Sequence, residues 1–544
     1  MLQKFFLMLK NEFHGYNTKS LRSDIMAGAT VAAVALPLAL AYGVSSGASA
    51  AAGLITAIIA GFLIGGLSGA SYQLSGPTGA MTAILLPLIA REGLKGMFIA
   101  CFISGIILIL AGVFKLGNVI SYIPLPVIAG FTTGNALIIF ISQLDNITGM
   151  KSFGDSSLKK LVSYFTDPTA IRPISLIIGA AVILFMLFYP KKFVKIIPSS
   201  LAAIIIITVL NKIFGFDSFV VGKIPNTIIL PQRLSFFDLN LSEITKYITP
   251  AISIAALSMV ESLLCGASAG RMKNEKINSD IELVAQGVGN ALMPFLGGVP
   301  ATAAIARTSV AIKAGSKTRI TSIVHSVVLM STMLILAPVM SDIPLAALAG
   351  VLWVTAWRMN DWVMIKDIFK RKLKSAIWQF LITAIATIVF SLTYAIIIGI
   401  AFSLIMFLIK ISDVQVSVSH IDKERLGDNK YCEKFKKTEI AYIVGPLYFG
   451  TVDKLIDKLN GRAKMDTLIL SLRGVPLADL SAANALRDYC QKLIKNNTDV
   501  YLCGVQPVVM DVFERCGIAD HIGKDKFYWS ADLVLTELRN KEAC

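Results

Sequence analysis

The chain has few charged residues and few of the side chains that build metal centres. Only 16% of its 544 residues are charged, and its four histidines are scattered. Its seven cysteines contain no C-x-x-C spacing, and five of them lie after residue 411. This usage favours ordinary reduced thiols over a disulfide framework or a zinc site. A nucleophile–base pair and a phosphate-binding loop are also missing, so we expect neither an enzyme nor a bound metal or other cofactor.

Apolar residues dominate instead. They make up 55% of the chain, and the mean hydropathy is +0.70. Uncharged runs such as Met97–Phe114 and Ile377–Leu392 are at or near the length that crosses a bilayer. The first 21 residues are amphipathic and basic, without a signal-peptide cleavage site. We therefore expect an α-helical polytopic membrane protein in the cytoplasmic (inner) membrane.

The net charge of +16 lies entirely in residues 1–411, because acidic and basic side chains cancel in 412–544. An anionic solute, acidic lipid or nucleic acid could each account for such an excess. The positions of the basic residues distinguish these explanations. Each basic cluster follows an apolar span, which is where the positive-inside rule places the charge of cytoplasmic loops. Nucleic-acid binding is therefore not expected. The clusters are Lys191/Lys192/Lys195, Arg271/Lys273/Lys276, Lys313/Lys317/Arg319 and Lys366–Lys374.

An internal repeat indicates that the membrane part is built twice. Residues 116–130 recur at 336–350 with eight of fifteen positions identical. Such repeats are typical of two-halved transporters. We expect about fourteen membrane segments, and the repeated ones are the fifth and the twelfth. A separation of seven crossings reverses direction, which predicts two inverted repeats of seven segments. The segments begin near residues 24, 51, 75, 97, 121, 173, 199, 247, 281, 302, 320, 343, 375 and 393.

The chain is predicted to have three parts: a cytoplasmic N-terminal segment (1–22), a transporter domain (23–411) and a small α/β domain (412–544). Apolar strand patterns alternate with amphipathic helices in the last part. With a cytoplasmic N-terminus, an even number of crossings leaves the α/β domain in the cytoplasm. The expected strands are 440–448, 467–472 and 499–505, and the expected helices are 452–459, 483–494 and 508–516.

Two membrane segments look broken. Glycine and proline are concentrated in 75–80 and in 297–302, each just before an apolar stretch too short to span. These residues discourage a continuous helix and predict an extended piece followed by a half-helix. A half-helix that begins at mid-membrane presents unpaired N–H groups and a partial positive charge, so two of them make an anion site. The alternative is a pair of ordinary loops at the membrane surface.

Two ionisable residues fall in or beside these apolar segments. Arg307 could hold an oxyanion near the start of the tenth segment, or it could be a structural ion-pair partner, most plausibly of Glu261. Glu261 is surrounded by leucine and valine. An unpaired carboxylate is costly there, so it is either fixed in an ion pair or protonated for part of a cycle. The second reading makes Glu261 a coupling site for a proton or sodium.

The chain resembles the bacterial members of the sulfate permease (SulP) family of anion transporters with a C-terminal STAS domain. The resemblance covers nearly the whole sequence. It rests on Leu36-Pro37 to Tyr42-Gly43, Ser75-Gly76-Pro77-Thr78, Glu261-Ser-Leu-Leu, Gly289-Asn290, Gly297-Gly298-Val-Pro300 and Arg307-Thr308, with Gly445 to Phe449 and Val475 to Ser481 in the STAS part.

The resemblance implies a fold shared with nucleobase–cation symporters. A core domain of segments one to four and eight to eleven would carry substrate past a gate domain in an elevator motion. The family pattern gives substrate contacts to Tyr42, to Pro77 and Thr78, and to Ala306 and Arg307, and cation coupling to Glu261. The full predicted substrate-binding set is Tyr42, Pro77, Thr78, Gly79, Ala80, Ala306, Arg307 and Thr308, and the coupling set is Glu261, Cys265 and Thr302.

The sequence departs from the family pattern at three places. Ala306 stands where several members have serine, and Leu38 where some have glutamine, so binding should depend more on backbone N–H groups and Arg307. Glu261 stands where members described as sodium-coupled tend to have aspartate, which favours a proton.

In soluble STAS proteins a phosphorylated serine matches Ser481. Its other reading is a helix N-cap before Ala482.

We therefore expect a proton-coupled symporter of a small anion: sulfate, bicarbonate, chloride or a dicarboxylate. A homodimer is the usual state of the family, and the STAS domain could bind a cytoplasmic partner. Three alternatives stay open at this point. They are sodium coupling, a nucleobase–cation symporter of the same fold, and an anion sensor that signals through the STAS domain.

Overall fold

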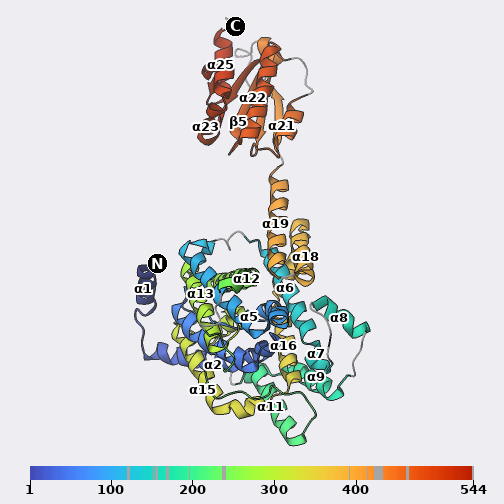
Figure 1. Cartoon of the computed structure of the whole chain (residues 1–544). Helices are drawn as coiled ribbons and strands as arrows, with labels where there is room; N and C mark the ends of the chain where they lie inside the picture. Colours follow the sequence, from blue (N-terminus) through green and yellow to red (C-terminus); the bar gives the residue numbers. More distant parts are fainter. Residues whose placement is uncertain are drawn as a thin grey trace. The chain divides into compact units, whose positions relative to one another are not determined.

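The computed structural model describes residues 1–118, 123–150, 152, 157–166, 171–194, 197–235, 241–390, 392–412, 414–421, 433–460 and 465–541. The chain divides into two compact units, Met1–Ser403 and Leu404–Cys544 (Figure 1). This division falls inside helix α19 (Leu392–Ile411), and the predicted domain limits stay predictions. Part of the first repeat copy, residues 119–122, lies outside the described residues.

The larger unit is almost entirely helical, because backbone N–H and C=O groups in a membrane must be satisfied within the segment. In the described part of the chain, seven continuous helical stretches are long and apolar enough to cross a bilayer. The second of them contains a π-helical turn, Ala60–Ile64. The helices are α2 (Thr18–Ser45), α3 (Ala50–Ile59) with its continuation α4 (Gly65–Leu67), α5 (Gly79–Val113), α6 (Leu125–Ser142), α12 (Leu241–Lys273), α15 (Ile320–Ser341) and α19.

The remaining segments are short or contain charge. Helix α5 is two segments, because Gly93 breaks it with a left-handed φ of 69°. The fourteen predicted segments are all present within the described residues. They are the seven long stretches, the second half of α5, four short apolar helices, and α13 and α14. The short ones are α9 (Pro173–Phe188), α11 (Ser199–Phe214), α16 (Leu345–Met359) and α18 (Lys374–Val389), and the last two are α13 (Ser279–Leu296) and α14 (Ile305–Lys313).

The membrane helices form two packed groups. In the first, α5 packs along α12 and α13, and α2 packs along α3 and α15. In the second, α6 packs on α18, and α16 packs on α9. These groups contain the segments assigned to the core and to the gate. Short helices connect the segments: α1 (Leu2–Glu12), α7 (Leu144–Thr148), α8 (Ser157–Thr166), α10 (Lys191–Val194) and α17 (Trp362–Lys370).

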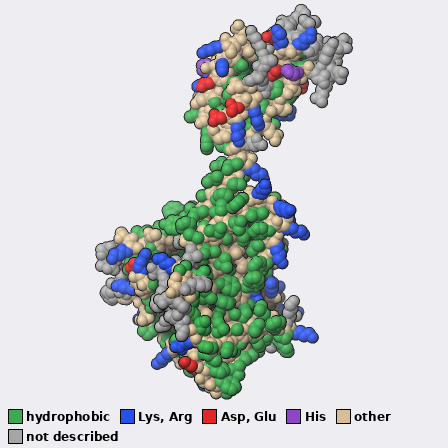
Figure 2. Space-filling model, turned by 90° about the vertical axis from the view of Figure 1, so that its right-hand side faces the viewer, with side chains coloured by type: hydrophobic (Ala, Val, Ile, Leu, Met, Phe, Trp, Pro, Cys, Tyr) green, Lys and Arg blue, Asp and Glu red, His purple; other side chains and the backbone are tan. Residues whose placement is uncertain are grey.

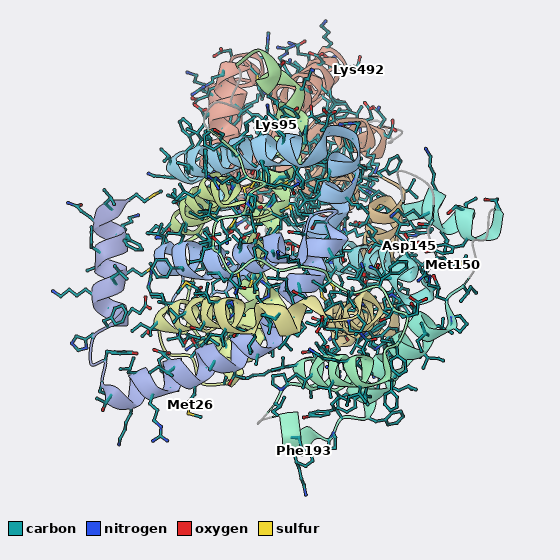
Figure 3. All side chains as sticks on the ribbon, turned by 60° about the horizontal axis from the view of Figure 1, so that its bottom comes forward. Met26, Lys95, Asp145, Met150, Phe193 and Lys492 are labelled. Carbon is teal, nitrogen blue, oxygen red and sulfur yellow. The ribbon has the colours of Figure 1, made fainter. Side chains whose placement is uncertain are left out.

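The outer surface of this unit is apolar. Hydrophobic side chains cover much of the face of the helical unit in Figure 2. Large apolar side chains such as Phe188 and Ile335 are exposed, and in Figure 3 Met26 and Phe193 point away from the bundle. Contiguous exposed apolar surface of this kind indicates contact with lipid, in agreement with a multi-pass membrane protein.

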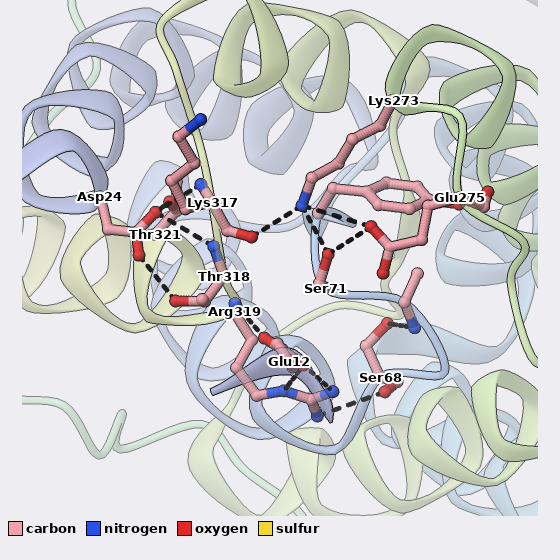
Figure 4. Close-up of polar contacts among 12 residues, drawn as sticks. Glu12, Asp24, Ser68, Ser71, Lys273, Glu275, Lys317, Thr318, Arg319 and Thr321 are labelled. Carbon is pink, nitrogen blue, oxygen red and sulfur yellow. Dashed lines mark hydrogen bonds and ion pairs between the residues drawn. The ribbon is translucent and has the colours of Figure 1, made fainter. Parts of the chain in front are cut away.

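A buried carboxylate ties the first membrane helix to the start of α15 (Figure 4). Asp24 Oδ1 accepts from the Lys317 N–H at 2.6 Å, the Thr318 N–H at 3.1 Å and the Thr321 hydroxyl at 2.9 Å. Its Oδ2 accepts from the Thr318 hydroxyl at 2.6 Å and from the Tyr16 hydroxyl at 2.9 Å. Burial, followed by the hydrogen bond to Asp24, raises the pKa of Tyr16 to about 12, so the phenol remains a donor.

Two ion pairs surround this junction. Glu12, the last residue of α1, pairs with Arg319 at 2.7 Å, and both side chains are only 4% exposed. Arg319 also donates to the Gly66 carbonyl at 2.8 Å. On the other side of the close-up, Lys273 pairs with Glu275 at 3.4 Å (Figure 4). Lys273 also donates to the Lys317 carbonyl at 2.7 Å, so charged residues of α1, α2 and α12 hold the α14–α15 connection.

Asp24→Ala should destabilise the protein strongly. It would leave five donors without their acceptor, three of them buried, at a cost of roughly 3 kcal/mol or more. Asp361→Ala is the matched control, since Asp361 caps α17 at an exposed site through one bond of 3.0 Å from the Met364 N–H. That change should cost only about 1 kcal/mol. Thermal unfolding in detergent measures both, and equal shifts would contradict the proposed importance of the Asp24 junction.

The second unit is a five-stranded sheet with helices on both faces. The strand order is β3-β4-β5-β6-β7, with β3 antiparallel to β4 and the other neighbours parallel. Alternate residues of β5 (Thr467–Gly474) serve two cores, since Leu468 and Leu470 pack under α22 and α21 whereas Ile469 packs under α25. The other strands are β3 (Gln415–His420), β4 (Thr438–Val444), β6 (Asp499–Cys503) and β7 (Phe527–Tyr528).

The three expected strands and three expected helices of this unit are present, and the structure adds strands β3 and β7. The expected helices appear as α21 (Val452–Leu459), α22 (Leu480–Lys495) and α23 (Pro507–Arg515). The two additional strands lie at the edges of the sheet, where an apolar pattern is weakest. Helices α24 (Ile518–Ile522) and α25 (Ala531–Lys541) complete the described part.

Candidate functional site

The two broken segments meet as a short strand pair. Strands β1 (Ser75–Gly76) and β2 (Thr302–Ala303) run antiparallel, with Gly76 opposite Thr302. Antiparallel pairing of equivalent positions is what inverted repeats produce at their symmetry axis. All four residues are buried, so these stretches are not loops at the membrane surface. Each strand then leads into a half-helix, the first part of α5 and the nine-residue α14.

Both half-helices begin without a side-chain cap. Thr78 stands at the N-cap of α5 and Ala304 at the N-cap of α14, and neither side chain accepts from the first turn. The first-turn N–H groups therefore remain available to a ligand. Each end carries roughly half a positive charge. Ala306 is exposed at the start of α14, whereas Gly79 and Ala80 at the start of α5 are buried.

Glu261 joins the two halves. It projects from α12, and its Oε2 accepts from the Thr78 hydroxyl at 2.9 Å and from the Thr302 hydroxyl at 2.6 Å. The two hydroxyl oxygens are 3.3 Å apart. Glu261 as a residue is half-buried. It thus combines a fixed orientation with access from outside the packed core, which suits a group that takes up and releases a cation.

Arg307 does not pair with Glu261, so the predicted alternative of an ion pair between them is wrong. Its guanidinium is 1% exposed, and Nη2 donates to the Pro77 carbonyl at 2.6 Å. Nε and Nη1 have no hydrogen-bond partner among the described residues. A Cβ atom at Gly76 would lie only 2.0 Å from Nη1, so a residue without a side chain is needed there. Arg307 therefore offers a full charge and unpaired donors close to both broken segments.

The other predicted residues divide into two sets. Tyr42 is buried at the site. Its ring edge lies 3.2 Å from the point where a Cβ atom added at Gly79 would stand. Thr308 and Cys265 lie together but apart from the Glu261 carboxylate contacts. The Thr308 hydroxyl accepts from the Leu74 N–H at 3.1 Å and contacts the Cys265 thiol at 3.4 Å. Thr308 thus supports the start of β1 through Leu74, and among the described residues no hydrogen bond joins Thr308 or Cys265 to Glu261.

Sequence reasoning missed the residues that hold the extended piece before α14. The Asn290 side chain makes two hydrogen bonds to the backbone of Ala301. It accepts from the Ala301 N–H at 2.7 Å and donates to the Ala301 carbonyl at 2.9 Å. Thr56 brackets Val299 in the same way at 2.7 Å and 2.9 Å. Polar side chains inside apolar helices were the available signal, since a membrane interior makes unpaired polar groups costly.

A cavity lies between the two helix groups, beside the first part of α5. Its volume is about 620 Å³. It reaches Thr82, one turn beyond Thr78, and continues past Arg91 of α5. Its wall is completed by side chains from both groups, namely Ser45, Ile138, Ser142, Lys160, Thr249 and Tyr394. Arg91 and Lys160 add basic side chains to the lining, and each also pairs with an acidic residue, Glu92 at 3.2 Å and Asp145 at 4.0 Å respectively.

Ser481 does not cap a helix. The N-cap of α22 is Asp479, whose carboxylate accepts from the Ala482 N–H at 2.8 Å. The predicted capping reading of Ser481 is therefore wrong. Ser481 is instead exposed in the first turn of α22, where its hydroxyl is accessible. Its phosphorylation stays a prediction.

Comparisons with known proteins place this arrangement in a family. Residues 21–385 match the model of the "Sulfate permease family", and residues 433–532 match that of the STAS domain. The chain is 32% identical to the "Putative sulfate transporter YvdB" of Bacillus subtilis, over 96% of this chain and 98% of that protein. It is 28% identical to the "Bicarbonate transporter BicA" of Picosynechococcus sp., over 97% and 96% of the two chains.

Solved structures agree on the fold. The structure of SLC26A9 superimposes with a TM-score of 0.82 at 19% identity, over 97% of this chain and 92% of that one. The transmembrane domain of a cyanobacterial bicarbonate transporter BicA gives a TM-score of 0.63 at 26% identity, over 72% and 98%. The fold class is thereby confirmed as a transporter of two inverted seven-segment repeats followed by an α/β STAS domain. Since its relatives are named as transporters, the chain is a transporter and not an enzyme. It belongs to the sulfate permease family and carries a C-terminal STAS domain.

Proposed function

We propose that this protein is a secondary active transporter that binds a small anion between the two half-helix ends and moves it together with a proton. One observation carries the proposal: two uncapped half-helices begin beside an arginine that has unpaired donors. Backbone N–H groups and a guanidinium both favour oxyanions. The relatives named as sulfate and bicarbonate transporters make these two anions the first substrates to test. Chloride and dicarboxylates follow.

Glu261 is the proposed proton carrier. Its carboxylate contacts hydroxyl groups and, within the described residues, no basic side chain. A proton on the free oxygen would therefore neutralise it without breaking an ion pair. Tyr42 would close the site beside Gly79, and the N–H groups of Gly79, Ala80 and Ala306 would contact the anion.

An elevator motion is the proposed route across the membrane. The strand pair, Glu261 and Arg307 all belong to the helix group assigned to the core, so the whole site can move as one body. The cavity lies between this group and the gate, as a sliding interface requires. We further propose a homodimer in the cytoplasmic membrane. The positive-inside rule favours a cytoplasmic N-terminus and a cytoplasmic STAS domain, where a protein partner could bind.

Uptake into proteoliposomes tests the proposal. Purified protein should accumulate radiolabelled sulfate or bicarbonate when the lumen is more alkaline than the medium, and a sodium gradient alone should have no effect. Accumulation driven only by sodium would favour sodium coupling. Uptake of uracil but of no anion would favour the nucleobase alternative. An intact membrane unit, residues 1–411, should retain flux, whereas a sensor without net transport should show none in either form.

A further inference from the structure

His325 is a buried ionisable residue to which the proposed mechanism gives no role. It lies in α15 and is completely buried, and neither ring nitrogen has a hydrogen-bond partner among the described residues. A neutral imidazole carries one donor and one acceptor. Leaving such groups unpaired in the interior costs about 1–3 kcal/mol each. An unpartnered buried histidine therefore calls for a physical explanation.

The imidazole faces an irregular turn of the second membrane segment. Its Cδ2 lies 3.0 Å from the Cβ position of Gly61, which belongs to the π-helical turn Ala60–Ile64. On the same side, the Ser322 hydroxyl donates to the Gly61 carbonyl at 2.8 Å. Single π-helical turns occur frequently at functional sites. The turn and the histidine thus form one buried polar region in an otherwise apolar bundle.

Arg307 approaches the same face of that segment. The Cβ position of Gly76 is 2.0 Å from Arg307 Nη1 and 3.6 Å from the Cα of Ala57. Ala57 and Gly61 are four residues apart and so lie about one turn from each other on one face of the helix. In the part of the chain that the structure describes, Arg307 Nε and Nη1 and both His325 nitrogens have no hydrogen-bond partner. Within the described residues, four buried nitrogen atoms without a partner therefore lie near two consecutive turns of this segment.

We propose that His325 is a positioning residue for Arg307, acting through a water molecule held between them. The water accepts from the guanidinium and donates to the unprotonated ring nitrogen of a neutral imidazole. Water commonly satisfies buried polar groups in this way, at little cost relative to a direct bond. The link holds the guanidinium beside the Pro77 carbonyl, where its charge reinforces the two half-helix ends. This inference rests on the proposed anion transport.

Removing the ring nitrogens tests the link. His325→Leu should raise the KM for sulfate or bicarbonate about tenfold, with the maximal rate per folded molecule little changed, because a water-mediated bond to Arg307 is lost. His325→Gln keeps a donor and an acceptor and should restore KM to within about threefold. Leu329→Met, one turn along the same helix at a buried position, is the matched control. An unchanged KM in His325→Leu would overturn the proposal.

A measurement on the intact site covers the case in which these variants fail to fold. The triple variant H14Q/H420Q/H521Q removes three exposed histidines and leaves His325 as the only one. With ¹⁵N-labelled histidine in proteoliposomes, saturating sulfate or bicarbonate should shift the NMR signals of the ring nitrogens. The shift is expected because the bound anion changes the hydrogen bonding of the guanidinium that is linked to them. Identical spectra with and without the anion would overturn the link.

Failure of this inference can be separated from failure of the proposed function. If the parent protein accumulates neither sulfate nor bicarbonate, the proposed function fails first. If the parent transports and Arg307→Ala does not, while His325→Leu keeps its KM and the nitrogen signals stay still, only the positioning role of His325 is wrong.

Discussion

Arg307→Ala is expected to reduce anion uptake at least about a hundredfold, the loss of two or more charge-assisted hydrogen bonds to a bound oxyanion. The guanidinium is fully buried and is held by one bond, 2.6 Å, to the Pro77 carbonyl. Two of its nitrogens remain unpaired. The variant should still fold, since it removes a buried charge together with only one hydrogen bond. Initial rates of sulfate and bicarbonate uptake, normalised to folded protein, measure the effect.

Two further arginine variants define the cause. Arg307→Lys keeps the charge but not the planar set of donors, so it should retain intermediate activity. Arg233→Ala removes an arginine that also donates to a backbone carbonyl, that of Leu230 at 3.2 Å, outside the half-helices. It should transport normally. Unimpaired uptake by Arg307→Ala would reject the anion site and would favour a neutral substrate, which does not need the charge.

Two glycine variants test whether the placement of the Arg307 guanidinium beside Gly76 of β1 matters. Gly76→Ala places a methyl group 2.0 Å from Arg307 Nη1, so the guanidinium must leave its position. The variant should therefore resemble Arg307→Ala although it keeps the arginine. At Gly66, by contrast, an added Cβ meets nothing within 4 Å, and Gly66→Ala should be nearly silent. Equal behaviour of the two variants would mean that the placement of Arg307 does not matter.

The sequence predicted the broken segments because their cause is local. Glycine and proline interrupt a helix wherever they occur, so 75–80 and 297–302 could be recognised without knowledge of the fold. The pairing of Gly76 with Thr302 could only be expected in outline, since it depends on how two distant segments meet. The same limit explains the error about Arg307 and Glu261. Opposite charges suggested an ion pair, whereas the fold supplies two threonine hydroxyls to the acid and a carbonyl to the arginine.

Competition between neighbouring residues explains two other differences. Asp479 and Ser481 both suit an N-cap, and the helix begins two residues earlier than the capping reading required, so the aspartate takes the role. Thr308 directly follows Arg307 in the sequence but turns toward Leu74 and Cys265 instead of toward Glu261. A helix places residues on one face at intervals of three or four, and a motif of adjacent residues therefore cannot point entirely into one site.

Glu261→Gln is expected to abolish proton-driven accumulation while leaving anion binding nearly intact. The glutamine has the shape of the glutamate, and its amide oxygen can accept from both Thr78 and Thr302, as the carboxylate Oε2 does now. The strand pair should thus stay in place. An amide takes up no proton at ordinary pH, so the variant cannot form the protonated, anion-bound state that couples the two fluxes. Transport should become a downhill exchange of anion for anion.

The size of the effect follows from the gradient. With one proton per anion and the membrane potential set to zero, each pH unit contributes about tenfold to the accumulation ratio in the parent protein. In Glu261→Gln that ratio should fall to about one at every pH gradient, with counterflow of labelled sulfate or bicarbonate preserved. Steady-state accumulation at several imposed gradients measures this directly, and a parallel series with sodium gradients separates the two cations.

Glu282→Gln is the matched control, because Glu282 is another glutamate of the same helix group and is fully buried. Its carboxylate accepts from the Ser68 hydroxyl at 2.5 Å, the Gly69 N–H at 3.0 Å and the Gln286 amide at 2.9 Å, so it is fully engaged in holding a turn. Its replacement should lower stability but keep the response to pH. If Glu261→Gln still accumulated anion in proportion to the proton gradient, the coupling proton would have to travel through another group, and the two threonines would hold Glu261 for structural reasons alone.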